Sequence, residues 1–161
     1  MTLSALVQAG TPHIIVCGSD EAARAALVPV REYCYVAMVD GRMCSSKAKV
    51  MSAIASALDF PSYFGRNWDA LDECLTDLSW LDVPRVALTF MHAASILAKR
   101  PKQRSTLIEV IKEAVSYWIE SGCGERSMPF LVALWHSESR QASKLRAELG
   151  EHGISTVALS L

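Results

Sequence analysis

The sequence lacks the marks of several large classes of protein. No apolar run approaches the roughly 20 residues that a membrane-spanning helix needs, and the opening stretch MTLSALVQAGTP has no basic segment typical of a secretory signal. A P-loop, a dinucleotide-binding fingerprint and a GxSxG elbow are also missing. We therefore expect a cytoplasmic protein that has no membrane partner and is not an enzyme.

Patterns that bind metals are lacking as well. No two cysteines have CxxC spacing and no two histidines have HxxxH spacing, which are the arrangements expected of common metal sites. The cysteines are odd in number, dispersed and mostly in apolar surroundings, which is typical of buried free thiols: Cys17, Cys34, Cys44, Cys74 and Cys123. The sequence thus predicts neither a metal site nor a cofactor.

The sequence also lacks an excess of positive charge. The net charge is -1 and the pI about 6.4, so nothing indicates a nucleic-acid partner. The only basic run, residues 99–104, is short and has no interleaved aromatic residues, so we expect a solvated connecting loop. A length of 161 residues with 51% hydrophobic and 20% charged residues fits one compact domain, residues 1–161.

What is present is an alternation of strand and helix patterns. Residues 1–12 are expected to be a loosely held terminus, and strands are predicted near residues 13–17, 33–39, 86–91, 129–135 and 154–159. Helices are predicted between them, including a long helix that ends near Ser121 with Ile119 facing inward, and a last helix over Glu138–Leu149. Such alternation predicts an α/β fold with a mainly parallel sheet.

The segment Asp59–Asp82 is the most distinctive part of the chain. It carries six acidic residues against one base, Arg66, a local charge of -5, so the remaining residues sum to +4. Asn67 is placed to cap a helix that begins near Trp68. On this helix the apolar residues recur at three- and four-residue steps and predict a buried side: Trp68, Leu71, Leu75 and Leu78.

The opposite side of this helix gathers carboxylates and one hydroxyl: Asp69, Asp72, Glu73, Thr76 and Asp77. Like charges at this spacing repel, so a partner with positive charge would stabilise the face. Three other readings remain open: a solvated helix face, a site for a divalent cation, and acid-base catalysis. The last two need ligands that converge, whereas one convex helix face supplies them from one side only.

The run PSYFGRNWDALDECLT, residues 61–76, closely resembles the signature of the barstar family of ribonuclease inhibitors. The resemblance implies a three-stranded parallel sheet packed against helices and covers about residues 33–136. The N-terminal extension, residues 1–32, and the C-terminal extension, residues 137–161, each contain one strand and one helix pattern. We expect them to extend the same sheet to five strands.

The resemblance also implies a function, that of a bacterial immunity protein that blocks the cationic active site of a barnase-like ribonuclease or related toxin. Tyr63 would pack on the active-site histidine, Asp69 would reach the basic residues, and Glu73 would enter the cleft as a mimic of RNA phosphate. Thr76 would add a hydrogen bond, and Glu113 of the long helix a second acid. The implied contact surface comprises Tyr63, Phe64, Gly65, Asn67, Asp69, Asp72, Glu73, Thr76, Asp77 and Glu113.

The chain departs from the family pattern at several of these positions. Glu73 is one methylene longer than the usual aspartate, Phe64 lacks a tyrosine hydroxyl, and Asp72 and Leu78 stand where the family has aromatic residues. The departures leave inhibition of some cationic nuclease or toxin as the prediction. The alternative is an interaction module of the same fold whose partner is not a nuclease.

Overall fold

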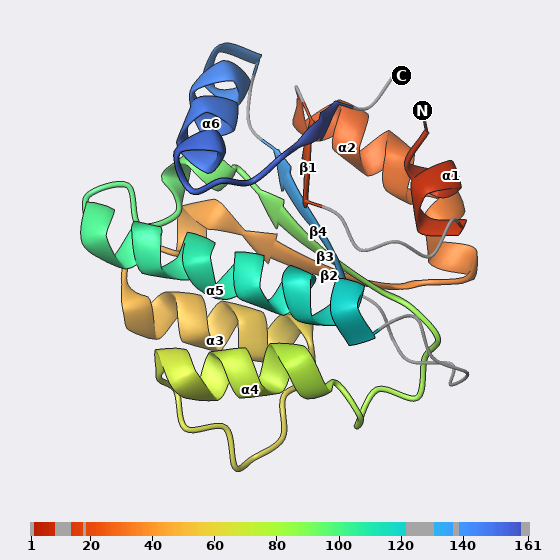
Figure 1. Ribbon diagram of the computed structural model, residues 1–161, viewed down its shortest axis with the longest axis vertical. Helices are drawn as coiled ribbons and strands as arrows, with labels where there is room; N and C mark the ends of the chain where they lie inside the picture. The colour runs from red at the N-terminus through yellow and green to blue at the C-terminus, as the bar shows by residue number, and fades with distance from the viewer. Residues whose placement is uncertain (1, 9–13, 18, 122–130, 137–138, 159–161) are drawn as a thin grey trace.

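The computed structural model describes residues 2–8, 14–17, 19–121, 131–136 and 139–158, which form an α/β fold (Figure 1). The helices are α1 (Leu3–Gln8), α2 (Asp20–Leu27), α3 (Lys47–Ala57), α4 (Trp68–Asp77), α5 (Pro101–Ser121) and α6 (Ser139–Glu151). The strands are β1 (Ile14–Cys17), β2 (Tyr35–Asp40), β3 (Val86–Met91), β4 (Leu131–His136) and β5 (Val157–Ala158). Short 3-10 turns lie at Pro29–Glu32, Gly41–Met43 and Ala93–Ser95.

The strands form one five-stranded parallel sheet in the order β2-β3-β4-β1-β5. Strand β1 lies inside the sheet, with Ile14 opposite Ala133 of β4, and it also pairs with β5. The predicted extension of a three-stranded core to five strands is therefore confirmed, since β1 and β5 come from the two ends of the chain.

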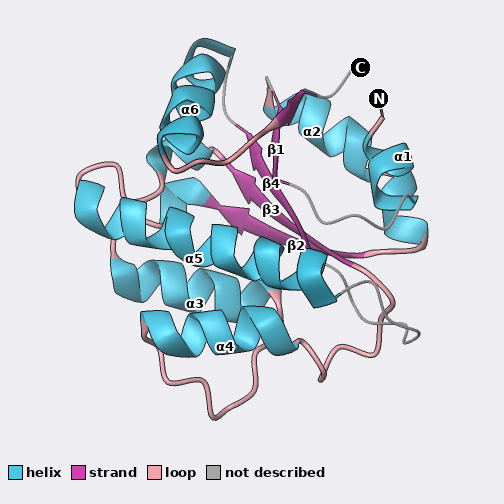
Figure 2. Ribbon diagram, in the orientation of Figure 1, coloured by secondary structure: helices cyan, strands magenta, loops and turns pink. Residues whose placement is uncertain are grey.

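Helices cover both faces of the sheet (Figure 2). Val86, Leu88 and Phe90 of β3 belong to a large core that includes buried residues of α3, α4, α5 and α6. Ala87 belongs to a second, smaller core with residues of α1 and α2 on the opposite face. All six residues of β3 are buried, as expected of an apolar strand that is covered on both sides.

Three local predictions were wrong. Residues 3–8 form α1 rather than a loose terminus, because Leu3 is buried and the Ser4 hydroxyl lies 2.6 Å from that of Tyr33. The basic run 99–104 is largely helical, since α5 already begins at Pro101. Ile119 is 47% exposed instead of facing inward. The predicted last helix is confirmed as α6, which continues two residues further, to Glu151; residues 1, 9–13, 129–130, 138 and 159 of the predicted segments lie outside the described residues.

Candidate partner-binding site

Helix α4 begins at Trp68, as its sequence predicts. Asn67 has extended backbone angles, and its side-chain oxygen accepts a hydrogen bond of 2.8 Å from the Ala70 amide, so it is the N-cap. The helix ends where Leu78 takes a left-handed conformation with φ at 50°, and its amide still donates to the Cys74 carbonyl. Leu78 is fully buried, so it offers a partner no contact surface.

Replacing Asn67 by alanine is expected to lower the free energy of unfolding by about 1 kcal/mol, because the Ala70 amide loses its side-chain acceptor. Urea unfolding followed by circular dichroism measures the loss. Asn67→Asp is the matched control, since a carboxylate oxygen can accept the same bond and its charge suits the positive end of the helix. An equal loss in both variants would contradict the capping role.

The buried side of α4 packs on α5. Leu71 and Leu75 are fully buried, and Cys74 is nearly so. The indole N–H of Trp118 donates a hydrogen bond of 2.8 Å to the Leu75 carbonyl, which fixes the C-terminal half of α4 against α5. The two helices therefore form one continuous outer layer that presents α4 at its edge (Figure 1).

The exposed side of α4 is acidic. Asp69, Glu73 and Asp77 are exposed, whereas Asp72 is half-buried. None of these carboxylates is ion-paired with another described residue. The face thus holds negative charge that the described part of the fold leaves unneutralised.

Glu113 of α5 adds to this charge. Partial burial raises the pKa of Asp72, and the charges of Glu113, Asp69 and Glu73 raise it further. Such an influence requires Glu113 to lie close to Asp72 across the seam between the two helices. The structure therefore places Glu113 near the acidic residues of α4, whereas its role in binding a partner stays a prediction.

Replacing Asp72 by asparagine is expected to stabilise the fold at pH 7, by roughly 0.2–0.5 kcal/mol for each like-charged neighbour relieved. The folded-state pKa of Asp72 lies above its unfolded-state value, so folding takes up a proton between the two. Stability of the wild type therefore falls as the pH rises through that interval, and the advantage of the variant should disappear below it.

Urea unfolding at a series of pH values tests this expectation. Asp82→Asn serves as the control, because Asp82 is an exposed carboxylate that lies outside α4. A stabilisation by Asp72→Asn that stays constant as the pH falls, or has the opposite sign, would contradict the repulsion.

The loop between α3 and α4 carries the aromatic part of the site. Tyr63 is 71% exposed and therefore available to a partner. Phe64 is half-buried, and its ring packs edge-on against that of Phe60, with 4.9 Å between the ring centroids. The Phe60 ring packs in turn edge-on against that of Trp80, with 5.5 Å between the centroids. The Trp80 indole N–H donates to the Leu58 carbonyl at 2.9 Å. This stack of rings supports the loop from behind and holds Phe64 in place.

A small pocket of about 130 Å³ separates this loop from α4. It is lined by Tyr63, Phe64, Gly65, Ala70, Glu73, Cys74 and Asp77. A Cβ added to Gly65 would lie 3.3 Å from the side-chain nitrogen Nδ2 of Asn67 and 3.4 Å from Ala70 Cβ, so the Asn67 side chain would have to shift by a few tenths of an ångström. Glycine at this position therefore lets the loop lie close to the start of α4.

Two of the predicted contact residues already have bonds within the fold. The Thr76 hydroxyl donates to the Asp72 carbonyl at 2.8 Å, so toward a partner it can act as an acceptor. The Asn67 side-chain oxygen is taken by the helix cap, and its amide is 3.4 Å from the Gly65 carbonyl. Asn67 therefore acts chiefly on the shape of the site.

Sequence reasoning missed some residues of this surface. Tyr117 is 43% exposed and lies one helical turn after Glu113 on α5, where the helical period would have indicated a shared face. Ala70 and Cys74 line the pocket, but the spacing of the helix alone did not distinguish them from core residues. Their exposure to the pocket depends on the path of the preceding loop.

In the described ranges, no group of three or more His, Cys, Asp or Glu side chains is arranged to hold a metal ion. Cys34, Cys44 and Cys74 are free and buried, in agreement with their predicted state, while Cys123 lies outside the described residues. Burial raises the pKa of Cys34 to about 12 and that of Cys44 to about 11. No helix in the part of the chain that the structure describes is long and apolar enough to cross a bilayer.

The sequence matches a known family over most of these elements. A family profile described as Barstar (barnase inhibitor) matches residues 34–135. A putative ribonuclease inhibitor of Bacillus subtilis, YrdF, is 35% identical over 79 residues, which are 48% of this chain and 81% of the relative. The chain therefore belongs to the barstar family.

Solved structures of ORC proteins resemble nearly the whole length of this chain. The ORC2 protein of Aeropyrum pernix, in ADPNP-ADP complexes, matches 99% of this chain with a TM-score of 0.61 and 17% identity. The match to the structure of Drosophila ORC bound to DNA covers 98% of this chain and 85% of the Drosophila chain, with a TM-score of 0.52 and 13% identity. This chain spans less than half the length of the archaeal protein, 44%. At these identities the likeness shows the fold alone.

Proposed function

We propose that this protein is an inhibitor, or immunity protein, that binds the cationic active site of a microbial ribonuclease or related toxin. The acidic side of α4 and the loop before it would occupy the cleft, with the Glu73 carboxylate taking the place of an RNA phosphate. A nuclease must hold phosphate with arginine and lysine side chains, so its cleft is complementary to this face. The partner is therefore a protein, not a nucleic acid.

One observation carries this proposal. The α4 carboxylates are exposed or half-exposed, close to Glu113, and without ion pairs to other described residues, in a chain of a family of barnase inhibitors. Repulsion between carboxylates at this spacing destabilises the free protein. A cationic partner would neutralise these charges and so explain the arrangement. The relative in Bacillus subtilis is named a putative ribonuclease inhibitor, which supports the same class of partner.

The test is a titration of the protein against a barnase-type ribonuclease while RNA cleavage is followed. We expect stoichiometric inhibition that weakens as salt is raised from low to physiological ionic strength, because screening reduces the attraction between exposed charges. Absence of inhibition at micromolar concentration, with the protein folded, would reject this partner class. A pull-down from the source cell would then search for a partner that is not a nuclease.

We also propose that residues 1–161 form one cytoplasmic domain, in which a barstar-like core of about residues 33–136 is enlarged by both extensions. The bidentate ion pair of Arg104 in α5 with Glu148 in α6, at 2.6 and 2.8 Å, supports this organisation. So does the contact of His152, which follows α6, with Glu109 of α5 at 2.5 Å. These bonds join the C-terminal extension to the core. Limited proteolysis tests the proposal, since a single domain should resist cleavage near residues 33 and 136.

A further inference from the structure

An open groove follows the first half of α3. We call it the α3 groove; its volume is about 400 Å³, and it is lined by Met43, Ala48, Lys49, Ser52 and Ala53. This volume falls in the range of roughly 300–1,000 Å³ that is usual for ligand sites. Met43 is 67% exposed, and the methionine side chain adapts its shape readily to an apolar partner. The α3 groove shares no lining residue with the pocket beside α4.

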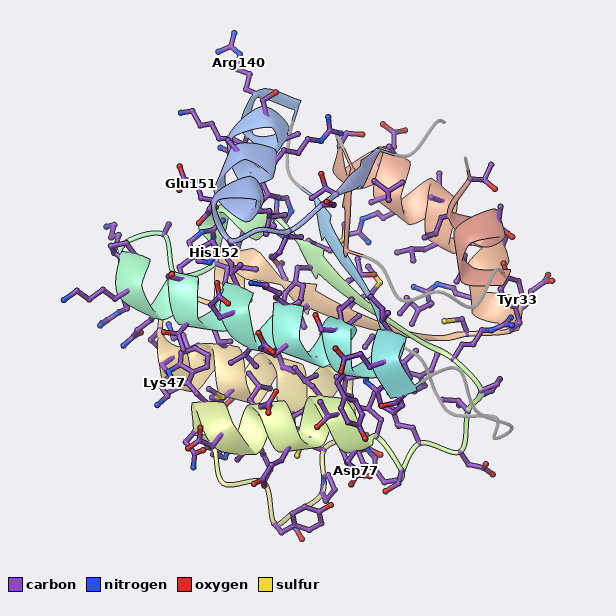
Figure 3. The ribbon with its side chains drawn as sticks, in the orientation of Figure 1. Tyr33, Lys47, Asp77, Arg140, Glu151 and His152 are labelled. Atoms are coloured by element: carbon purple, nitrogen blue, oxygen red, sulfur yellow. The ribbon has the colours of Figure 1, made fainter. Side chains whose placement is uncertain are left out.

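The charge around the α3 groove is positive. Lys49 lines the groove, and Lys47 stands two residues earlier, at the N-terminal end of α3 (Figure 3). From the loop before α4, the Arg66 guanidinium donates a hydrogen bond of 2.9 Å to the Ser52 hydroxyl. None of these three cations is ion-paired with another described residue. Since residues 41–58 contain no Asp or Glu, an anionic group would meet cations there and no carboxylate from this segment.

The position of these cations destabilises the free protein. Lys47 and Lys49 occupy the first turn of α3, where the helix dipole favours acidic residues and disfavours basic ones. Arg66 has a φ of 53°, a left-handed conformation that is unfavourable for most residues other than glycine. Two unrelated local strains therefore bring positive charge to the same groove. Binding of an anionic group would compensate for both.

The lining indicates which kind of anion fits. The Ser52 hydroxyl accepts its bond from Arg66, so its own proton remains available to an acceptor on a ligand. The described lining contains no aromatic ring on which a nucleic-acid base could stack. Met43 and Ala53 instead offer apolar surface next to the Lys49 ammonium. This combination matches a carboxylate-bearing chain that also carries an apolar side chain.

We propose that the α3 groove binds a segment of an acidic protein in which carboxylates flank one apolar anchor side chain. The anchor would pack on Met43, Ala48 and Ala53, while the flanking carboxylates pair with Lys49 and Arg66. This inference goes beyond the proposed function, because the lining of the groove shares no residue with the acidic surface of α4. The protein would then have two docking surfaces of opposite charge.

The experiment uses three short peptides with blocked ends as probes: Glu-Glu-Leu-Glu-Glu, its uncharged analogue Gln-Gln-Leu-Gln-Gln, and Glu-Glu-Gly-Glu-Glu, which lacks the anchor. The amide signals of Ala48, Ser52 and Ala53 of the full chain are followed by NMR during titration at low salt. We expect saturable shifts with the first peptide and much weaker binding of the other two. Screening by added salt should weaken the binding of the first peptide.

Lys49→Gln should weaken binding of the acidic peptide about two- to fivefold, as expected for the loss of one exposed ion pair. Its fold should persist, since the backbone amide of Lys49 still donates to the Ser46 hydroxyl, and urea unfolding checks this. Lys144→Gln is the matched control, because Lys144 is an exposed lysine on α6 that does not line the groove. It should bind the peptide as the wild type does.

Several results would overturn the proposal. They are the absence of saturable shifts with the acidic peptide, equal binding of the charged and uncharged peptides, and equal binding with and without the leucine anchor. Equal affinity of the wild type and a folded Lys49→Gln variant would also reject it. Tighter binding of a five-nucleotide oligothymidylate than of the acidic peptide would assign the groove to nucleic acid instead.

Discussion

Replacing Glu73 by alanine is expected to weaken inhibition of a barnase-type ribonuclease by about 2–4 kcal/mol, which is roughly a 30- to 700-fold rise in Kd. Glu73 is exposed at the middle of the acidic side of α4, and its carboxylate is the one proposed to enter the cleft. Truncation would leave the cationic groups of the nuclease buried without a counter-charge. Losses of this size are typical of interface hot spots, and the barnase–barstar complex is itself one of the examples behind this generalisation.

The loss must be separated from a change in net charge or in folding. Glu21→Ala is the matched control, because Glu21 is also an exposed glutamate on a helix, but on α2 across the sheet. Both variants should unfold at the same urea concentration as the wild type to within a few tenths molar. Asp69→Ala is measured beside them and should also weaken inhibition. Full inhibition by a folded Glu73→Ala variant would remove Glu73 from the contact.

Replacing Trp118 by alanine is expected to lower the free energy of unfolding by about 3–5 kcal/mol. The side chain is 1% exposed, and its removal would leave a cavity under α4 and α5 as well as a lost hydrogen bond to the Leu75 carbonyl. Urea unfolding followed by circular dichroism measures the effect. Since domains of ordinary stability have about 5–15 kcal/mol in total, this one change should leave a marginal fold.

Trp118→Phe separates the two contributions. Phenylalanine keeps most of the apolar volume but has no N–H to donate to the Leu75 carbonyl. We expect about 1–2 kcal/mol of destabilisation from the lost bond and the smaller ring. A loss below 1 kcal/mol in Trp118→Ala would mean that the seam between α4 and α5 is held by other contacts.

Local features of the site could be predicted because their causes are local. Asn67 caps α4 through an acceptor three residues from its donor, and Leu71 and Leu75 follow the helical period. The strand Val86–Met91 was predicted at its observed bounds, because a short, continuous apolar run is typical of a strand that is buried on both faces. The start of α5 was missed although Pro101 stands at the first helical position, where proline is favoured.

The remaining features depend on contacts between distant segments. Asp72 shares the period of the acidic face, but the packing of α5 makes it half-buried and near Glu113. The pocket exists because the stack of Phe60, Phe64 and Trp80 positions the loop, and these contacts have no sequence period. The position of β1 between β4 and β5 likewise depends on long-range pairing. The four residues of β1 predict a strand, but they do not indicate which strands it pairs with.

The place of β1 in the sheet has a consequence for synthesis on the ribosome. Ile14 pairs with Ala133, which is 119 positions later, whereas Tyr35 of β2 pairs with Val86 after only 51. At about 5–20 residues per second, the ribosome would take roughly 6–24 s to add the 119 residues that follow Ile14 up to and including Ala133. During that time β2, α3, α4 and β3 can already assemble, so the acidic helix can form on the nascent chain before the first strand has a neighbour to pair with.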